Sequence, residues 1–128
     1  MLRAEAGDKT LLITGATDGV GRVVAERLGA DGARVLVHGR NRERGAAVVD
    51  EIRRKGGTAE FLAADFSSLP ELCRLADAVR AQTPRLDILV YNAGTTATVW
   101  QASADGHELT FAVNYLAGFL LTRKPCRC

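Results

Sequence analysis

The 128-residue sequence has few aromatic residues and no long hydrophobic run. Aromatic side chains make up only 5% of it, too few for the stacking surfaces on which single-stranded nucleic acids bind. No stretch reaches the roughly 18 apolar residues that span a bilayer. The polar opening MLRAEAGDKT lacks the apolar segment of a secretory signal. We therefore expect a cytoplasmic protein with no membrane span.

The excess of positive over negative charge is confined to the last six residues. The chain has 17 basic and 15 acidic residues, a net charge of +2. Arg123, Lys124 and Arg127 supply the excess, because leaving them out gives 14 basic residues against 15 acidic ones, a balance of −1. A nucleic-acid-binding domain carries its basic patch on the folded body. We therefore expect no nucleic-acid partner.

Only three cysteines are present, Cys73, Cys126 and Cys128. An odd number in a chain without a secretory signal does not indicate a disulfide framework. A closed zinc site needs four ligands, and neither His38 nor His107 has a spacing that would complete one with the terminal thiols. We therefore expect no metal, and we interpret Cys126 and Cys128 as exposed thiols of a terminal tail.

Short apolar runs alternate with helical patterns along the chain. Strands are predicted at residues 10–14, 34–38, 58–64 and 86–91, and helices at residues 20–29, 41–55, 69–82 and 108–122. Parallel strands need crossover connections, and right-handed crossovers place helices on both faces of the sheet. The sequence therefore predicts an α/β fold with a doubly wound parallel sheet in the order 3-2-1-4.

A glycine-rich segment joins the first strand to the first helix. It reads Thr14-Gly15-Ala16-Thr17-Asp18-Gly19-Val20-Gly21, a G-x-x-x-G-x-G pattern. Glycines permit a tight turn and a close backbone approach, and a helix N-terminus offers free N–H groups and a positive dipole to a phosphate. We favour a pyrophosphate-binding loop, with Gly15, Thr17, Asp18, Gly19, Val20 and Gly21 at the cofactor. The alternative is a glycine-rich turn without a ligand.

The end of the second strand carries basic residues where an NAD-binding domain carries an acidic one. A carboxylate about 20 residues after the glycine loop bonds the ribose 2′-hydroxyl, whereas an arginine there suits a 2′-phosphate. This sequence reads His38-Gly39-Arg40-Asn41-Arg42. We therefore favour NADP over NAD, with Arg40 at the 2′-phosphate and with Arg22 and Arg42 as candidate helpers. The alternative is that these are ordinary solvated arginines.

Four motifs in this order resemble the short-chain dehydrogenase/reductase family. They are Thr14-Gly15-x-x-x-Gly19-x-Gly21, Asp65 after the third strand, Asn92-Ala93-Gly94 after the fourth, and residues 105–122 as the fourth helix. The resemblance covers residues 9–122 and is closest to the branch of retinol dehydrogenases and protochlorophyllide reductases. It implies a Rossmann-type fold and an NADP-dependent oxidoreductase that moves hydride between the nicotinamide and a small carbonyl or alcohol substrate.

The resemblance also implies roles for individual residues. Thr14 would brace the glycine loop, and Asp65, followed by Phe66, would bond the adenine amino group through its carboxylate. Asn92, Ala93 and Gly94 would flank the adenosine side of the cofactor and stabilise the central sheet. Tyr91 stands where the family usually has another asparagine.

Asn114 matches the helix asparagine of the family's catalytic tetrad, where it holds a water molecule in a proton relay. From the sequence alone, a buried polar residue that satisfies the helix backbone is an alternative interpretation.

The other catalytic residues that the resemblance implies, a serine and a Tyr-x-x-x-Lys, have no match in the sequence. Tyr91 is followed four residues later by Thr95, and Tyr115 by Phe119. Ser103 precedes the last helix and is interpreted as a cap or loop hydroxyl. We expect an N-terminal extension at 1–8, a partial cofactor-binding domain at 9–122 that is truncated after the fourth helix, and an atypical basic tail at 123–128.

Three functions therefore stay open: an NADP-dependent oxidoreductase, a non-catalytic NADP-binding fragment, and a structural fragment without cofactor affinity. The fourth strand would form an apolar edge, and the last helix would expose apolar residues, so either could serve as a surface for a homo-oligomer.

Overall fold

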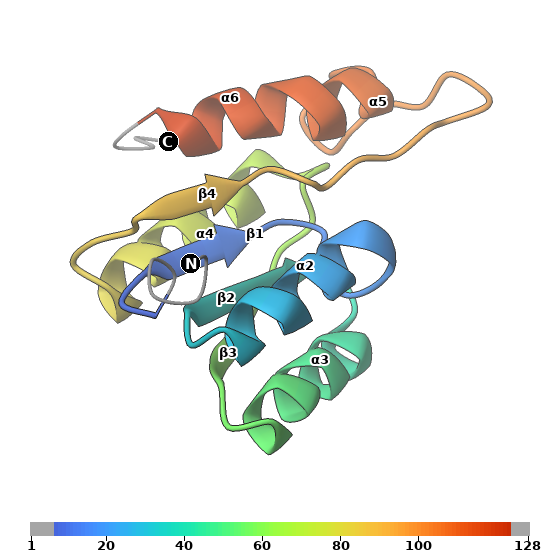
Figure 1. The fold of residues 1–128 in the computed structure, drawn as a ribbon. Coiled ribbons are helices and arrows are strands. Elements are labelled where there is room, and N and C mark those ends of the chain that lie inside the picture. The colour runs from blue at the N-terminus through green and yellow to red at the C-terminus, as the bar shows by residue number, and fades with distance from the viewer. Residues whose placement is uncertain (1–6, 124–128) are drawn as a thin grey trace.

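Four parallel strands form the centre of the computed structural model, which describes residues 7–123. The strands are β1 (Thr10–Ile13), β2 (Arg34–Gly39), β3 (Thr58–Ala63) and β4 (Ile88–Val90). Their order in the sheet is β3-β2-β1-β4 (Figure 1). This order and direction confirm the predicted doubly wound α/β fold. The expected extension at 1–8 and tail at 123–128 lie mostly outside the described residues, as do Cys126 and Cys128.

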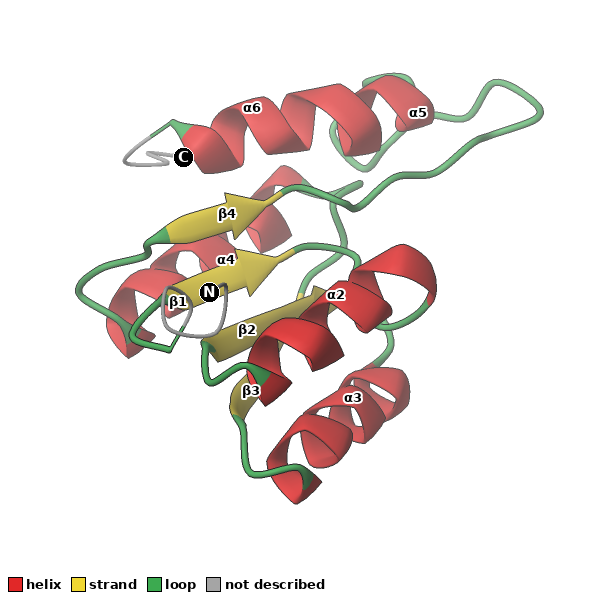
Figure 2. Ribbon diagram, in the orientation of Figure 1, coloured by secondary structure: helices red, strands yellow, loops and turns green. Residues whose placement is uncertain are grey.

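Helices cover both faces of this sheet (Figure 2). On one face, α2 (Gly19–Ala30) and α3 (Arg42–Arg54) pack against the strands and against each other. The other face is covered by α4 (Leu69–Gln82) and by the last helix of the described chain. That last helix consists of α5 (Leu109–Phe111), a π-helical turn η1 (Ala112–Leu116) and α6 (Ala117–Thr122).

Two hydrophobic clusters lie on the two sides of the sheet because successive strand side chains point to opposite faces. Leu11 and Ile13 of β1 pack with Val48 and Ile52 of α3 on one side. Leu12 of β1 packs on the other side with residues of α4 and α6, among them Leu72, Leu75 and Ala117. Burial on both faces explains why the strands are continuous apolar runs in the sequence.

Side chains cap three of the helices at their N-termini. Asn41 accepts a hydrogen bond from the backbone N–H of Arg44 at the start of α3, and Ser68 accepts one from Glu71 at the start of α4. The predicted cap at Ser68 is therefore confirmed. Glu108 accepts hydrogen bonds from the N–H groups of Thr110 and Phe111 and so begins α5.

The last helix and the edge strand differ from the expectation in detail. The predicted helix at 108–122 contains the π-helical turn η1, and β4 covers only the middle of the predicted strand at 86–91. β4 lies at the edge of the sheet, as expected, and Ile88 is 43% exposed. Three large side chains of the last helix are also exposed, namely Phe111, Tyr115 and Phe119.

Two further observations concern α4 and membrane contact. Cys73 of α4 is disulfide-bonded, a feature that the odd cysteine count did not indicate. Among residues 7–123, every helix is too short or too polar to cross a bilayer.

Thr14 joins the carboxyl ends of β1 and β4. Its side chain is fully buried, and its hydroxyl oxygen accepts hydrogen bonds from the backbone N–H groups of Asn92 and Ala93, both at 3.0 Å. Its own N–H donates to the carbonyl of Val90. The side chain therefore continues the β1–β4 ladder beyond the point where β4 ends.

Replacing Thr14 with valine should destabilise the protein by about 2 kcal/mol, because two partly buried N–H groups lose their acceptor while the side-chain shape is kept. Urea unfolding of the wild type and the variant measures this loss. Thr14→Ser keeps the hydroxyl and should recover most of the stability. Equal losses for the two variants would show that the hydroxyl does not hold the β1–β4 junction.

Candidate cofactor site

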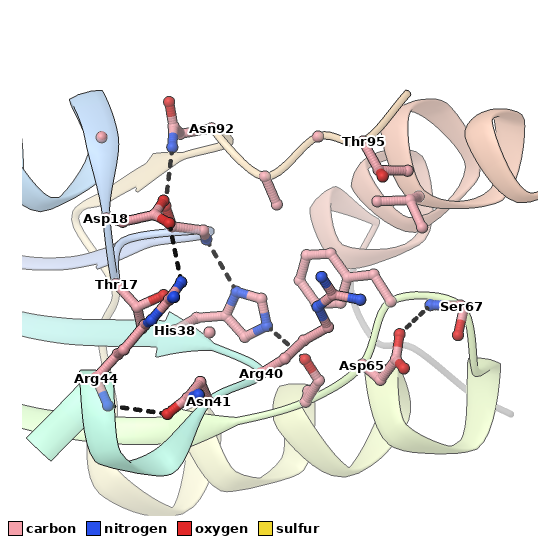
Figure 3. Close-up of a pocket in the computed structure, with 18 of the residues that line it drawn as sticks. Thr17, Asp18, His38, Arg40, Asn41, Arg44, Asp65, Ser67, Asn92 and Thr95 are labelled. Carbon is pink, nitrogen blue, oxygen red and sulfur yellow. Dashed lines mark hydrogen bonds and ion pairs between the residues drawn. The ribbon is translucent and has the colours of Figure 1, made fainter. Parts of the chain in front are cut away.

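A cavity of about 650 Å³ opens at the carboxyl ends of the strands (Figure 3). In open parallel sheets ligands bind at this edge, where the strand order reverses, here between β1 and β4. All the predicted cofactor-binding residues line the cavity except Thr14 and Gly21, namely Gly15, Thr17, Asp18, Gly19, Val20, Arg40, Asp65, Phe66, Asn92, Ala93 and Gly94. The volume is within the usual range of small-molecule sites, about 300–1,000 Å³.

The glycine loop lies directly against the segment that follows β4. Gly15 has a φ of +61°, and a Cβ there would be only 2.8 Å from the Cα of Ala93. Gly21 is buried under the loop, and a Cβ there would be 2.5 Å from both the carbonyl oxygen of Gly15 and the amide nitrogen of Asn92. That amide donates to the Gly15 carbonyl at 3.0 Å. Side chains at positions 15 and 21 would push the loop away from β4.

The N-terminus of α2 carries no side-chain cap. Asp18 is in the N-cap position, but its side chain makes no cap hydrogen bond, in contrast to Asn41 and Ser68 at α3 and α4. Gly19 and Val20, the first residues of the helix, both line the cavity. N–H groups at the start of a helix need acceptors from outside it, and they attract anions. The site therefore has the donors and the dipole to hold a phosphate group.

His38 at the end of β2 links three strands below the cavity. The Gly15 N–H donates to its Nδ1 at 3.1 Å, and its Nε2 lies 2.9 Å from the carbonyl oxygen of Ala64, so the neutral ring with a proton on Nε2 satisfies both contacts. The ring is 3% exposed and stacks on Phe66 with centroids 4.2 Å apart. Burial lowers the pKa of His38, and the positive charge of Arg40 adds to this effect, against the Ala64 hydrogen bond.

Two arginines reach the cavity wall, one from the turn directly after β2 and one from α3. Arg40 is exposed and lines the cavity, and within residues 7–123 it makes no ion pair. Arg44, which the sequence analysis did not single out, also lines the cavity and pairs with Asp18 at 3.2 Å. The suggested helpers do not line it, since Arg22 pairs with Glu26 on α2 and Arg42 is exposed outside the cavity.

Asp65 and Phe66 form the wall of the cavity after β3. One carboxylate oxygen of Asp65 accepts a hydrogen bond from the N–H of Ser67 at 2.9 Å, which fixes the orientation of the carboxylate. The ring of Phe66 is buried between His38 and Tyr91, with a nearly parallel stack on each side. The pair therefore offers a fixed hydrogen-bond acceptor next to a rigid apolar surface.

Asn114 contacts a loop and does not line the cavity. Its amide oxygen accepts from the N–H of Thr95 at 2.7 Å, and its amide nitrogen donates to the Thr95 carbonyl at 2.8 Å. Thr110, one turn earlier, accepts from the N–H of Ala97. Asn114 is exposed, so the alternative of a buried residue that satisfies its own helix is wrong. Its side chain instead holds the cavity wall at Thr95.

The remaining candidate groups have other partners. Ser103 is buried and accepts a hydrogen bond from the N–H of His107, as expected of a loop hydroxyl. Tyr91 donates its hydroxyl to the carbonyl of Val113. Burial raises the pKa of Tyr91 to about 12, which is opposite to the shift that a general acid needs at neutral pH. Within residues 7–123, no three potential metal ligands lie together.

Sequence reasoning missed His38, Arg44 and Thr95 as parts of the site. His38 was considered as a strand residue and rejected as a metal ligand, although its position at the end of the second strand already places it at the ligand edge. Arg44 lies four residues after Arg40, and Asn41 between them begins α3. Thr95 had no signal of its own, because its contact with Asn114 depends on how a long loop folds back.

Comparison with known proteins gives the family. Residues 9–128 match the family model for short chain dehydrogenases. The chain is 36% identical over 122 residues to dehydrogenase/reductase SDR family member 13 of Homo sapiens, which covers 94% of this chain and 32% of that protein. It is 35% identical over 129 residues to retinol dehydrogenase 14 of Homo sapiens, which covers 89% of this chain and 38% of that protein.

A solved structure agrees. A metagenomic short-chain oxidoreductase in complex with NADP superposes with a TM-score of 0.79 at 37% identity, over 88% of this chain and 52% of that one. The chain therefore belongs to the short-chain dehydrogenase family, and retinol dehydrogenases are among its relatives. It spans about a third of the length of the curated relatives described above.

The lowered pKa of His38 predicts a specific dependence of stability on pH. The unfolded chain, with an ordinary histidine pKa of about 6.5, binds the proton before the folded one as the pH falls. The free energy of unfolding should therefore be highest above about pH 6.5 and should decrease as the pH falls below that value. It should level off below the pKa of His38 in the folded protein. Urea unfolding from pH 8 to pH 5 measures the slope.

His38→Gln should remove most of this slope, whereas His107→Gln, at an exposed loop position, should keep it. A slope that survives in His38→Gln would assign the pH dependence to other groups.

Proposed function

We propose that this chain binds NADP in the cavity, with the pyrophosphate against the N-terminus of α2. The observation that carries the proposal is the uncapped start of α2, with Gly19 and Val20 on the cavity wall. The close approach at Gly15 supports it, since only a residue without a side chain brings the loop backbone this near to the segment after β4. Helix N-termini of this kind bind phosphate through backbone N–H groups.

The preference for NADP over NAD rests on Arg40. No carboxylate occupies the end of β2, and Arg40 makes no ion pair within the described residues, so its guanidinium is available for a 2′-phosphate. Arg44 is a second candidate ligand. Its ion pair with Asp18 is solvent-exposed, with 61% and 74% of the two side chains accessible, so separating it has a small cost.

We place the adenine ring of the cofactor next to the segments that follow β3 and β4. The carboxylate of Asp65, oriented by the N–H of Ser67, would accept a hydrogen bond from the adenine amino group. Asn92, Ala93 and Gly94 would border the cofactor from the β4 side, where they line the cavity.

For the whole protein we propose hydride transfer between NADP and a small carbonyl or alcohol substrate. The nicotinamide would supply or accept the hydride. From this chain, the backbone of α2 would hold the phosphates, and Arg40 would orient the adenosine. Asn114, by holding the loop at Thr95, would shape the wall and remains the candidate for a proton relay.

A second candidate function for these 128 residues is NADP binding without turnover. It is favoured by the surroundings of the two tyrosines, neither of which is set up as a general acid. Tyr91 donates its hydroxyl to a backbone carbonyl and has a raised pKa, and Tyr115 is exposed and stacks on Phe111. Neither is followed by a lysine four residues later, and such an ammonium group lowers the pKa of a phenol by a charge effect.

Arg40→Asp should weaken NADPH binding by about 10- to 100-fold, because a charge-assisted contact to the 2′-phosphate is replaced by repulsion. NADH binding should change far less, since NADH lacks that phosphate. Fluorescence titration of both nucleotides measures the two affinities. Arg42→Asp makes the same charge change outside the cavity and should leave the ratio of affinities unchanged. Equal effects of the two variants would contradict a 2′-phosphate contact at Arg40.

Purified residues 1–128 should bind NADPH and show no carbonyl reduction above the no-enzyme rate. Absorbance at the NADPH band during incubation with a panel of aldehydes and ketones measures the rate. Steady consumption of NADPH that scales with protein concentration would exclude the binding-only alternative.

A further inference from the structure

Tyr91 occupies a special place between the sheet and the last helix. Tyr91 follows directly after β4, and its side chain is half-buried and reaches the π-helical turn η1, which carries Asn114. Its hydroxyl donates a hydrogen bond to the carbonyl of Val113 at 2.5 Å.

This contact coincides with the irregular part of the helix ladder. The N–H of Ala117 bonds to the carbonyl of Ala112, five residues earlier, instead of to that of Val113 four residues earlier. The Val113 carbonyl receives the tyrosine hydroxyl instead. A side chain that inserts into the helix ladder is a known cause of local helix irregularity, and π-turns accommodate one extra residue in this way.

The ring of Tyr91 is held firmly on both sides. One side stacks on Phe66 with centroids 5.9 Å apart and planes within 6°. On the helix side, position 118 is glycine, and a Cβ there would lie 3.1 Å from two ring atoms. The ring therefore has little rotational freedom, and its hydroxyl reaches the helix at one position, the carbonyl of Val113.

The π-turn determines where Asn114 lies. In a regular helix, with i to i−4 bonds through residues 112–117, the hydrogen-bond register would shift by one residue. The residues after the turn would then be rotated by about 100° around the helix axis relative to the residues before it. Thr110 and Asn114 now face the same loop, and they bond Ala97 and Thr95 respectively. Thr95, Leu109 and Val113 line the cavity on the side of the last helix, and we call this side the α5 end.

We propose that the hydroxyl of Tyr91 sets the register of the last helix by occupying the backbone of η1, which makes Tyr91 a positioning residue for Asn114 and for the α5 end of the cavity. Tyr91 itself does not line the cavity. The predicted effect on nucleotide binding rests on the proposed function, with adenosine near Arg40 and the nicotinamide toward the α5 end. The predicted effect on the helix does not.

The direct test is amide hydrogen exchange in the free chain, resolved by residue. Tyr91→Phe keeps the ring and removes only the hydroxyl. In the wild type the N–H of Thr95 donates a hydrogen bond to the side-chain oxygen of Asn114. We expect this N–H to exchange about 5- to 10-fold faster in Tyr91→Phe, as for the loss of one hydrogen bond. Core amides such as that of Val37 should be unchanged. Tyr115→Phe, on the exposed face of the same helix, is the matched control and should alter neither.

Gly118→Ala is a second variant, which presses on the ring of Tyr91 while leaving its hydroxyl present. It should also accelerate exchange at Thr95. Unchanged exchange at Thr95 in Tyr91→Phe would overturn the proposal, whatever Gly118→Ala does.

A binding measurement separates positioning from general destabilisation. Tyr91→Phe should weaken NADPH binding by about 5- to 10-fold, in proportion to the lost clamp at Thr95, and should leave the affinity for adenosine 2′,5′-bisphosphate unchanged, because that ligand stops short of the α5 end. Equal losses for both ligands would contradict a positioning role. If the wild type bound neither ligand, the proposed function would fail, while exchange at Thr95 would still decide the role of Tyr91.

Discussion

The close approach between the glycine loop and the segment after β4 is the contact on which the cavity depends. Gly15 lies against Ala93, and the Asn92 amide donates to the Gly15 carbonyl. The hydroxyl oxygen of Thr14 accepts hydrogen bonds from the backbone N–H groups of Asn92 and Ala93 and so holds this segment in place. The strand order reverses between β1 and β4, and ligands of open parallel sheets bind at the strand ends at this point. This contact therefore also fixes the position of the ligand site.

Charges in the cavity are arranged around that contact. The start of α2 is left without a side-chain cap, whereas α3 and α4 are capped by Asn41 and Ser68. Asp18 turns instead toward Arg44. A cap at Asp18 would compete for the same N–H groups that a phosphate needs, so the ion pair leaves the helix end open. Burial lowers the pKa of His38 and so favours the neutral ring, whose Nδ1 accepts the hydrogen bond from the Gly15 N–H.

The fold could be predicted from the sequence because its signals are local. Apolar strand runs and helical spacing gave the alternation, and Ser68 marked a helix start. The cavity wall was also largely predictable, since glycines and short polar motifs at strand ends point to one edge. Features that arise from contacts distant in the sequence were not predictable.

The π-turn is the clearest of these. The apolar spacing of residues 108–122 fits a regular helix, and the irregularity coincides with the hydroxyl of Tyr91, more than 20 residues earlier. The contact of Asn114 with Thr95 and the ion pair of Arg44 with Asp18 depend on the same kind of distant packing. The disulfide at Cys73 had no signal in the cysteine count.

We propose that the open start of α2 holds the phosphates of NADP. Backbone amide chemical shifts measured during titration of this chain with NADPH test it most directly. We expect the largest changes at Gly15, Gly19 and Val20, with further changes at Arg40. Saturable binding that leaves these amides unmoved, or the absence of any binding, would contradict it.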